Sequence, residues 1–232
     1  MKISSSNIRF LFMLLPSIGY AQANIWFGTG LNFAKMRKVY KEEVFSEEDN
    51  TRLGLNLGLY LNQACGEKTA IETALIYDTK GYISHYEMED ARFTERFRIH
   101  YFNLSPIMLQ HYFPLEEKQR YYIKTGPVLS IGLHGKIIQS DDNSYDVEVL
   151  NWEDKEIKRL DLAWNLSLGY EYNEALQVEL GYDMGLKNIS YDRNENLKLR
   201  NRCLKITTKI SLSYLFAPVV KKGQFINQYN ED

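Results

Sequence analysis

The sequence predicts an all-β protein: an eight-stranded antiparallel up-and-down transmembrane β-barrel with short periplasmic turns and long extracellular loops. Three observations predict it. Apolar and polar residues alternate with a period of two along most of the chain, which is the pattern of a strand with two different faces. The connections between alternating segments are short and long in turn, and glycine recurs on the polar side. No segment shows a convincing helical period.

Composition excludes several other classes of protein. The 232 residues carry 28 Lys and Arg against 30 Asp and Glu, a net charge of −2, and this near balance argues against a nucleic-acid partner. Two cysteines are too few for a small domain framed by disulfides. The sequence is too polar for several membrane-spanning helices, each of which needs ~20 largely apolar residues.

Residues 1–23 have the pattern of an export signal. Lys2 and Arg9 accompany the apolar run 8–15, and the small-x-small sequence 21–23 offers a cleavage site after Ala21 or Ala23. The apolar run is shorter than the ~17–25 residues that a membrane-spanning helix needs. We therefore expect a signal peptide at 1–23 and an exported mature chain.

Four segments alternate without interruption, at 52–62, 161–171, 176–187 and 203–216. In the first, leucine occupies every odd position from Leu53 to Leu61. Four weaker segments lie at 25–34, 70–80, 96–112 and 121–134, and the pattern at 96–112 loses its phase near a proline. The clear segments reach the ~9–11 residues that a tilted crossing of a bilayer requires. The count predicts eight strands between residues 24 and 216.

The lengths of the connections predict how the strands are joined. Residues 63–68, 113–120 and 172–175 form short turns, whereas 35–50, 81–95, 135–159 and 188–202 are long and charged. Short periplasmic turns and long extracellular loops are typical of outer-membrane barrels. We expect the chain in the cell outer membrane as a multi-pass barrel, with a polar periplasmic tail at 217–232.

The composition of the polar face favours a membrane barrel over a soluble one. Glycine weakens a solvated strand, but it suits a narrow lumen and a strongly curved wall. The apolar face is rich in leucine and isoleucine with aromatics toward its ends, as a lipid-facing band requires. The alternative is a soluble periplasmic lipocalin-like carrier of a small ligand, whose apolar face would point inward.

The polar face also predicts the contents of the lumen. An eight-stranded barrel is only wide enough for its own side chains to fill it. Charges in so narrow a space should pair, because a buried charge without a partner is costly. We therefore expect a plugged lumen that holds a structural network of charged side chains: Arg52, Glu72, Asp78, Arg98, Lys124, Asp161, Glu171, Glu179, Asp183, Lys187, Lys205 and Lys209.

Several segments resemble the PorT-type outer-membrane β-barrel family of Bacteroidetes. They are YFNLSPIML at 101–109, YYIKTGP at 121–127, VELGYDMGLKNI at 178–189 and the closing SLSYLF at 211–216. The closing segment is similar to the aromatic-terminated last strand that the barrel-assembly machinery recognises. The resemblance implies an integral outer-membrane protein, and one branch of the family assists a secretion system. The extension past the terminal aromatic departs from many members.

The sequence carries no convincing catalytic or cofactor motif. Ser84 and His85 are adjacent, and neighbours along a strand point to opposite faces, so they are badly placed for a serine nucleophile and its base. The acidic run 141–146 lacks the glycine turn and terminal glutamate of a calcium loop. We expect no enzyme activity, no cofactor and no metal site.

The long loops hold the remaining candidate for a binding surface. Alternation through 145–149 suggests that the sheet continues above the membrane, and apolar residues there could dock a partner. The expected partners are outer-membrane lipid, the barrel-assembly machinery during biogenesis, and a protein bound through the extracellular loops or the periplasmic tail. The candidate loop docking surface consists of Tyr145, Val147, Val149, Leu150 and Trp152.

Overall fold

The structure, a computed structural model, describes residues 23–40, 43–44, 49–88, 91–116, 118–140, 144–150, 152, 157–190 and 197–215. The expected signal peptide, apart from Ala23, and the expected tail at 217–232 lie outside these residues. Among the described residues, no helix combines the length and the apolar character that crossing a membrane requires.

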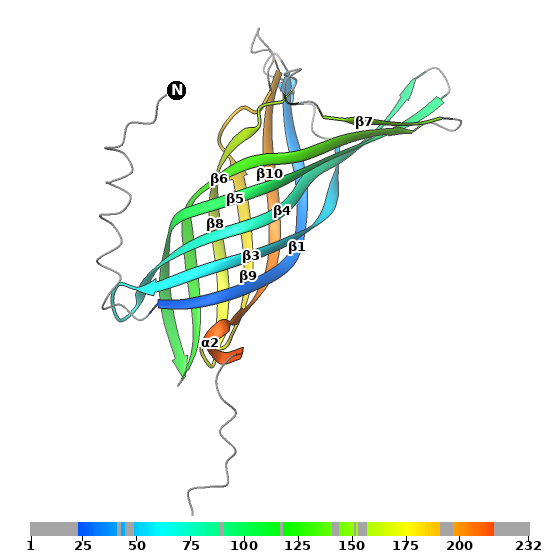
Figure 1. Cartoon of the computed structure of the whole chain (residues 1–232). Helices are drawn as coiled ribbons and strands as arrows, with labels where there is room; N and C mark the ends of the chain where they lie inside the picture. The colour runs from blue at the N-terminus through cyan, green and yellow to red at the C-terminus, as the bar shows by residue number, and fades with distance from the viewer. Residues whose placement is uncertain are drawn as a thin grey trace, which may run out of the picture.

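Eight long strands close into one antiparallel ring, which confirms the predicted fold class (Figure 1). Each strand pairs with the next along the ring, and the last strand pairs with the first, from Trp26 opposite Ser211 to Tyr40 opposite Leu197. The ring strands are β1 (Ala23–Tyr40), β3 (Asp49–Ala64), β4 (Thr69–Met88), β5 (Ala91–Glu116), β6 (Gln119–Ser140), β8 (Leu160–Tyr172), β9 (Leu176–Gly185) and β10 (Leu197–Ser211).

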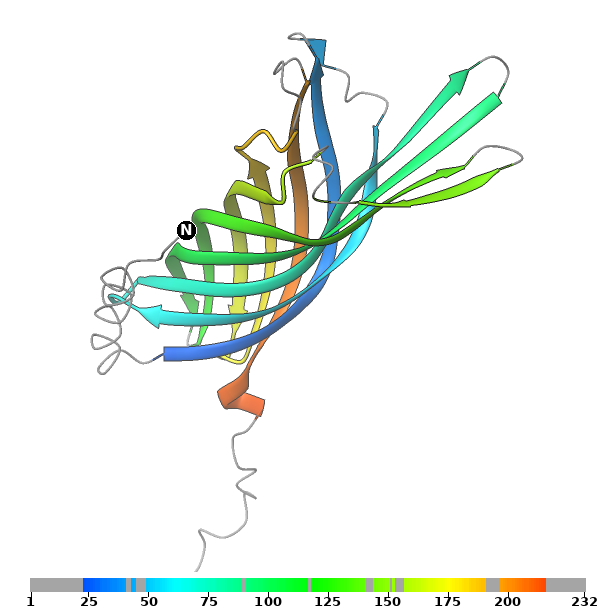
Figure 2. The same ribbon diagram turned by 45° about the horizontal axis from the view of Figure 1, so that its top comes forward.

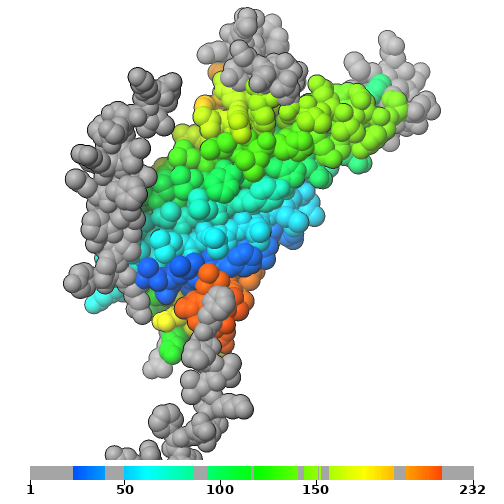
Figure 3. All heavy atoms as spheres, in the orientation of Figure 1, coloured from blue at the N-terminus to red at the C-terminus, as the bar shows by residue number. Residues whose placement is uncertain are grey.

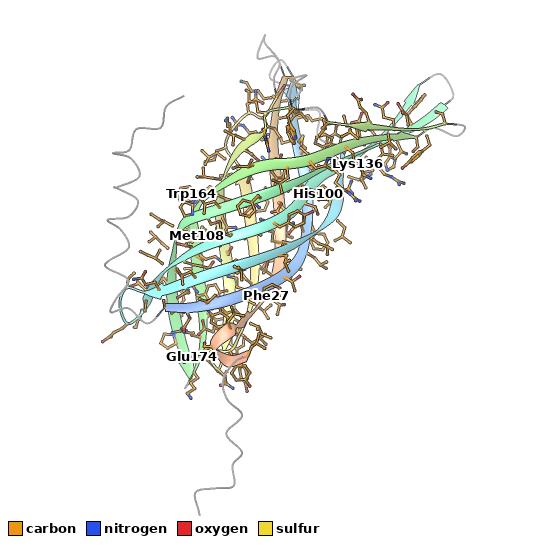
Figure 4. The ribbon with its side chains drawn as sticks, viewed as in Figure 1. Phe27, His100, Met108, Lys136, Trp164 and Glu174 are labelled. Carbon is orange, nitrogen blue, oxygen red and sulfur yellow. The ribbon has the colours of Figure 1, made fainter. Side chains whose placement is uncertain are left out.

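The leucine side of the strands faces outward. Leu53, Leu55, Leu57 and Leu59 of β3 are 47–62% exposed, whereas Asn56 between them is 2% exposed. Figure 4 shows the outer wall with Phe27 and Trp164 among its labelled side chains. A soluble carrier of the lipocalin type would have the opposite arrangement, so that alternative is wrong for this chain.

Short turns join the strands at the end where β1 begins and β10 ends. Residues 65–68 join β3 to β4, 117–118 join β5 to β6, and 173–175 join β8 to β9. Asn173 and Glu174 both have positive φ angles, of 52° and 55°, as a tight hairpin whose twist matches its strands requires. This end corresponds to the periplasmic side of an outer-membrane barrel.

At the opposite end, much of what the sequence predicts as loop is strand. β1 continues to Tyr40, and β4 and β5 continue until only residues 89–90 separate them. β6 runs on to Ser140 and pairs there with β7 (Tyr145–Val149), while β2 (Glu43–Val44) pairs with the end of β1. The expected loop at 81–95 is therefore largely wrong, and the one at 135–159 is wrong at 135–140 and 145–149. Charged residues suggested loops, but a sheet beyond the bilayer can be polar on both faces.

These extensions form a sheet that leans away from the barrel, which we call the projecting sheet. It consists of residues 81–88 of β4, 91–98 of β5, 135–140 of β6 and all of β7, paired in that order. Figure 2 shows its two hairpins reaching outward beside the mouth of the barrel.

The last strand begins and ends earlier than the alternation at 203–216 predicts. β10 ends at Ser211, and Leu212–Leu215 form the single turn α2. Phe216, the expected terminal aromatic, lies outside the described residues.

Candidate functional site

The lumen is the site that the sequence predicts most fully, and two groups of alternating charges lie at its centre. In the first group, Lys124 Nζ is 2.7 Å from both Glu72 Oε1 and Glu179 Oε2. Lys209 Nζ is 2.9 Å from Glu72 Oε2 and 2.8 Å from Glu179 Oε2. The four side chains come from four strands and form a closed ring of two anions and two cations.

The second group lies further toward the extracellular end. Lys205 Nζ is 2.8 Å from Asp78 Oδ2 and 2.6 Å from Asp183 Oδ2, and Lys80 Nζ is 3.5 Å from the same Asp183 oxygen. Asn103 donates to Asp78 and Asn165 donates to Asp183, each over 2.7 Å. The amide of Asn165 thus satisfies Asp183 Oδ1, which desolvation would otherwise leave at a high free-energy cost. Asp78 Oδ1 is buried and has no hydrogen-bond partner among the described residues.

A cavity of about 30 Å³ lies between the two groups, lined by Glu72, Lys124 and Glu179 from one and by Asp183 and Lys205 from the other. A cavity of ~10–15 Å³ holds one water molecule, so this space accommodates one or two. Buried side chains surround this small cavity at the centre of the lumen.

An apolar cluster closes the extracellular end of the lumen. It contains Met36, Tyr82, Phe97, Ile99, Tyr101, Ile189 and Leu199, and each of these side chains is at most 8% exposed. Leu150 and Trp152 pack against it from the segment after β7. They fit over glycines: a Cβ at Gly132 would lie 2.4 Å from the Trp152 ring, and one at Gly135 would lie 2.3 Å from Leu150.

The structure places ten of the twelve expected network residues inside the lumen. Besides the two central groups, Arg52 donates to the carbonyl oxygen of Phe97 over 3.1 Å, and Asp161 accepts from Asn201 over 2.8 Å. Glu171 accepts from Arg120 at distances of 2.6 and 2.9 Å. When Lys80 is added to the ten, the buried charged residues that the structure describes comprise six acids and five bases.

Arg98 and Lys187 lie outside the lumen, contrary to the prediction. An inward Arg98 would place its neighbours Phe97 and Ile99 on the lipid-facing side of the strand. These two residues instead belong to the apolar cluster in the lumen, so Arg98 faces outward. Lys187 follows the end of β9 at Gly185 and is exposed.

Lys80 is a buried charged residue of the lumen that the prediction missed. Like Glu72 and Asp78 on the same strand it has an even residue number, so the alternation alone could have placed its side chain in the lumen.

The expected docking residues divide into two groups. Tyr145, Val147 and Val149 are 43–67% exposed on β7. Leu150 and Trp152 instead pack against the apolar cluster at the extracellular end of the lumen.

The described residues contain no group of three or more His, Cys, Asp or Glu side chains placed to hold a metal ion. His85 contacts Thr94 Oγ1 at 3.0 Å from its Nδ1 atom, on the neighbouring strand. Cys65 is exposed, Cys203 is buried, and neither forms a disulfide. Part of the acidic run at 141–146 lies outside the described residues.

Comparison with models of known protein families shows which family the chain belongs to. Residues 15–191 match the model of a family described as outer membrane protein beta-barrel domain. The chain belongs to this family. As a member of the outer membrane protein β-barrel family, it is a multi-pass protein of the cell outer membrane, which confirms the location expected from the strand pattern.

Several solved outer-membrane structures are also similar, though distantly. Neisserial surface protein A shares 10% identity over 82% of this chain and 98% of its own, with a TM-score of 0.43. Ail, the attachment invasion locus protein of Yersinia pestis, shares 12% sequence identity over 82% of this chain and 99% of its own, with a TM-score of 0.40. OprG of Pseudomonas aeruginosa shares 10% sequence identity over 83% of this chain and 97% of its own, with a TM-score of 0.40. No curated protein sequence matches the chain.

Proposed function

We propose that this protein is a closed, non-catalytic outer-membrane barrel that holds a protein-binding sheet at the cell surface. One observation carries the proposal. The lumen is filled by paired charges and an apolar cluster, while β4, β5 and β6 continue beyond the barrel wall and β6 pairs there with β7. A barrel built to conduct would need a continuous polar path, and a barrel built only to fill the membrane would not need the projecting sheet.

A closed lumen has a direct electrical consequence. We expect the purified, refolded protein to insert into planar lipid bilayers without producing single-channel current steps. The reason is that ions would have to replace short contacts such as Lys124 to Glu72 at 2.7 Å and then pass the apolar cluster. A water-filled porin in the same bilayer serves as positive control. Reproducible current steps that scale with electrolyte concentration would contradict the closed lumen.

The binding part of the proposal rests on β7. It pairs with β6 along one edge, and among the described residues no strand pairs with its other edge. An open edge can accept an extended segment of another protein through main-chain hydrogen bonds, with alternate side chains adding specificity. Tyr145, Val147 and Val149 alternate on one face with Asp146 and Glu148 on the other. The proposed partner is therefore an extended polypeptide segment that adds to this edge.

Crosslinking in intact cells tests this surface. With a photoreactive residue in place of Val147, we expect one discrete crosslinked product whose partner peptide is identified by mass spectrometry. The matched control places the same residue at Val178, which is similarly exposed but lies on the lipid-facing wall of β9. The product should also disappear when Tyr145→Asp is added. Equal labelling at both positions, or no product at Val147, would contradict the proposal.

The PorT-type resemblance supports a role within a larger assembly. Three of the resembling segments, at 101–109, 121–127 and 178–189, supply lumen residues such as Asn103, Lys124 and Glu179. In this proposal the resembling segments build the closed barrel, and the projecting sheet supplies the contact that makes it an accessory of a transport or secretion complex.

A further inference from the structure

A large apolar hollow lies on the outer wall of the barrel, where β6 leaves β8 and bends into the projecting sheet. Its volume is about 500 Å³, within the ~300–1,000 Å³ range of small-molecule pockets. β6 and β8 pair as far as Ile131 opposite Leu160, and beyond this point β6 continues alone into the projection. In Figure 3 the wall formed by β3 to β6 passes without a break onto the projecting sheet.

The lining of the hollow is almost entirely apolar. Its apolar residues are Leu75, Phe102, Leu104, Leu129, Ile131, Leu160 and Leu162. Asp161, the one acidic residue at its border, is 3% exposed and accepts a hydrogen bond from Asn201 over 2.8 Å in the lumen. Lys187 also borders the hollow and is exposed. A concave apolar surface on the membrane-facing wall fits a hydrocarbon chain.

Cations gather immediately above the hollow on the same outer face. Arg98 of β5 stands directly opposite Lys136 of β6, and His100 stands opposite His134 with their ring centres 6.1 Å apart. Like charges directly opposite each other destabilise a sheet unless something neutralises them. Among the residues that the structure describes, neither Arg98 nor Lys136 forms an ion pair. Figure 4 shows His100 and Lys136 at the root of the projecting sheet.

Other cations also lie at this end of the outer wall. On the opposite side of the barrel, Lys35 of β1 stands opposite Arg202 of β10, again near the extracellular end of the outer wall. Arg159 and Lys187 lie at the same end, beside the start of β8. A belt of outward-facing cations at one end of an apolar wall matches a leaflet whose headgroups carry negative charge.

We propose that the hollow binds one phosphate-bearing lipid of the outer leaflet. An acyl chain occupies the apolar lining, and the phosphate binds between Arg98 and Lys136. The spacing fits this arrangement, because Phe102 lies four positions after Arg98 on the same strand, or ~13 Å away at ~3.3 Å per residue. The headgroup therefore lies above the hollow and the chain runs down into it. This inference does not depend on the proposed contact at β7.

Native mass spectrometry of the refolded full-length protein in a nonionic detergent tests the proposal with three probes. Phosphatidic acid provides chains and phosphate, diacylglycerol provides the chains alone, and glycerol phosphate provides the phosphate alone. We expect one molecule of phosphatidic acid to remain bound, at least tenfold more tightly than diacylglycerol, and no displacement by glycerol phosphate. Equal retention of the two lipids, or displacement by glycerol phosphate at the same concentration, would overturn the proposal.

Matched variants localise the bound lipid. The Arg98→Gln/Lys136→Gln protein should lose binding at least tenfold, and Leu129→Trp, which fills the hollow, should do the same. The control Lys35→Gln/Arg202→Gln removes an equivalent pair of opposed cations that does not border the hollow, and it should bind as the wild type does. Each variant is first required to show the heat-modifiable gel mobility of a folded barrel. Equal loss in the control pair would overturn the assignment to this hollow.

Discussion

Replacement of Glu179 by alanine is expected to lower the free energy of unfolding by about 3–5 kcal/mol, the range found when one partner of a buried ion pair is removed. Glu179 accepts hydrogen bonds from Lys124 over 2.7 Å, from Lys209 over 2.8 Å and from the hydroxyl of Tyr122 over 3.0 Å. Its removal leaves two buried ammonium groups sharing the single carboxylate of Glu72. Urea-induced unfolding of the protein in phospholipid vesicles measures the change.

The matched control for this prediction is Glu67→Ala. Glu67 lies exposed in the short turn between β3 and β4, so the same chemical change should have an effect close to zero. A second variant, Glu72→Leu combined with Lys209→Leu, removes one anion and one cation together and should be less damaging than Glu179→Ala. Similar stabilities of the Glu179→Ala and Glu67→Ala proteins would show that the charged groups in the lumen contribute no stability.

Replacement of Leu57 by arginine is expected to cost about 2–4 kcal/mol, as measured for cations placed at the midplane of barrel walls. Leu57 lies near the middle of β3 and is 47% exposed on the outer face. There its side chain contacts hydrocarbon, which offers a guanidinium group neither water nor a counterion. Folding into vesicles, followed by heat-modifiable mobility on a gel, should show a reduced folded fraction.

Leu57→Met provides the comparison, because it retains an apolar side chain of similar volume and should fold as the wild type does. Leu57→Arg folding as efficiently as Leu57→Met would mean that this face of β3 does not contact lipid.

Period-two alternation predicted most of the lumen because it distinguishes the two faces of a strand wherever the strand is regular. Glu179 and Asp183 lie on β9, where alternation is unbroken, and both are inside. Alternation does not state which apolar face is covered by lipid and which by protein. The prediction of Arg98 in the lumen failed for this reason, because Phe97 and Ile99 are apolar but lie in the lumen in one cluster with Met36 and Leu199.

Other features could not be predicted because they depend on contacts between distant segments. Trp152 closes the lumen only because Gly132, twenty positions earlier, leaves room for its ring. The projecting sheet depends on pairing such as Lys136 with Val149, which joins segments that are charged or short and that a local pattern does not distinguish from loops. The hollow on the outer wall is lined from β4, β5, β6 and β8, beside the point where β6 and β8 part. Its shape therefore depends on how four strands are arranged, which no single segment of sequence specifies.

Fluorescence quenching by brominated lipid tests most directly which side of the strands meets the membrane. Trp164 is 44% exposed on the outer wall and Trp26 is 1% exposed in the lumen, so two variants that each retain one of them report on the two faces. We expect acyl-chain bromine to quench Trp164 strongly and Trp26 barely in folded protein. Equal quenching of the two, or stronger quenching of Trp26, would contradict the outward orientation of the apolar face.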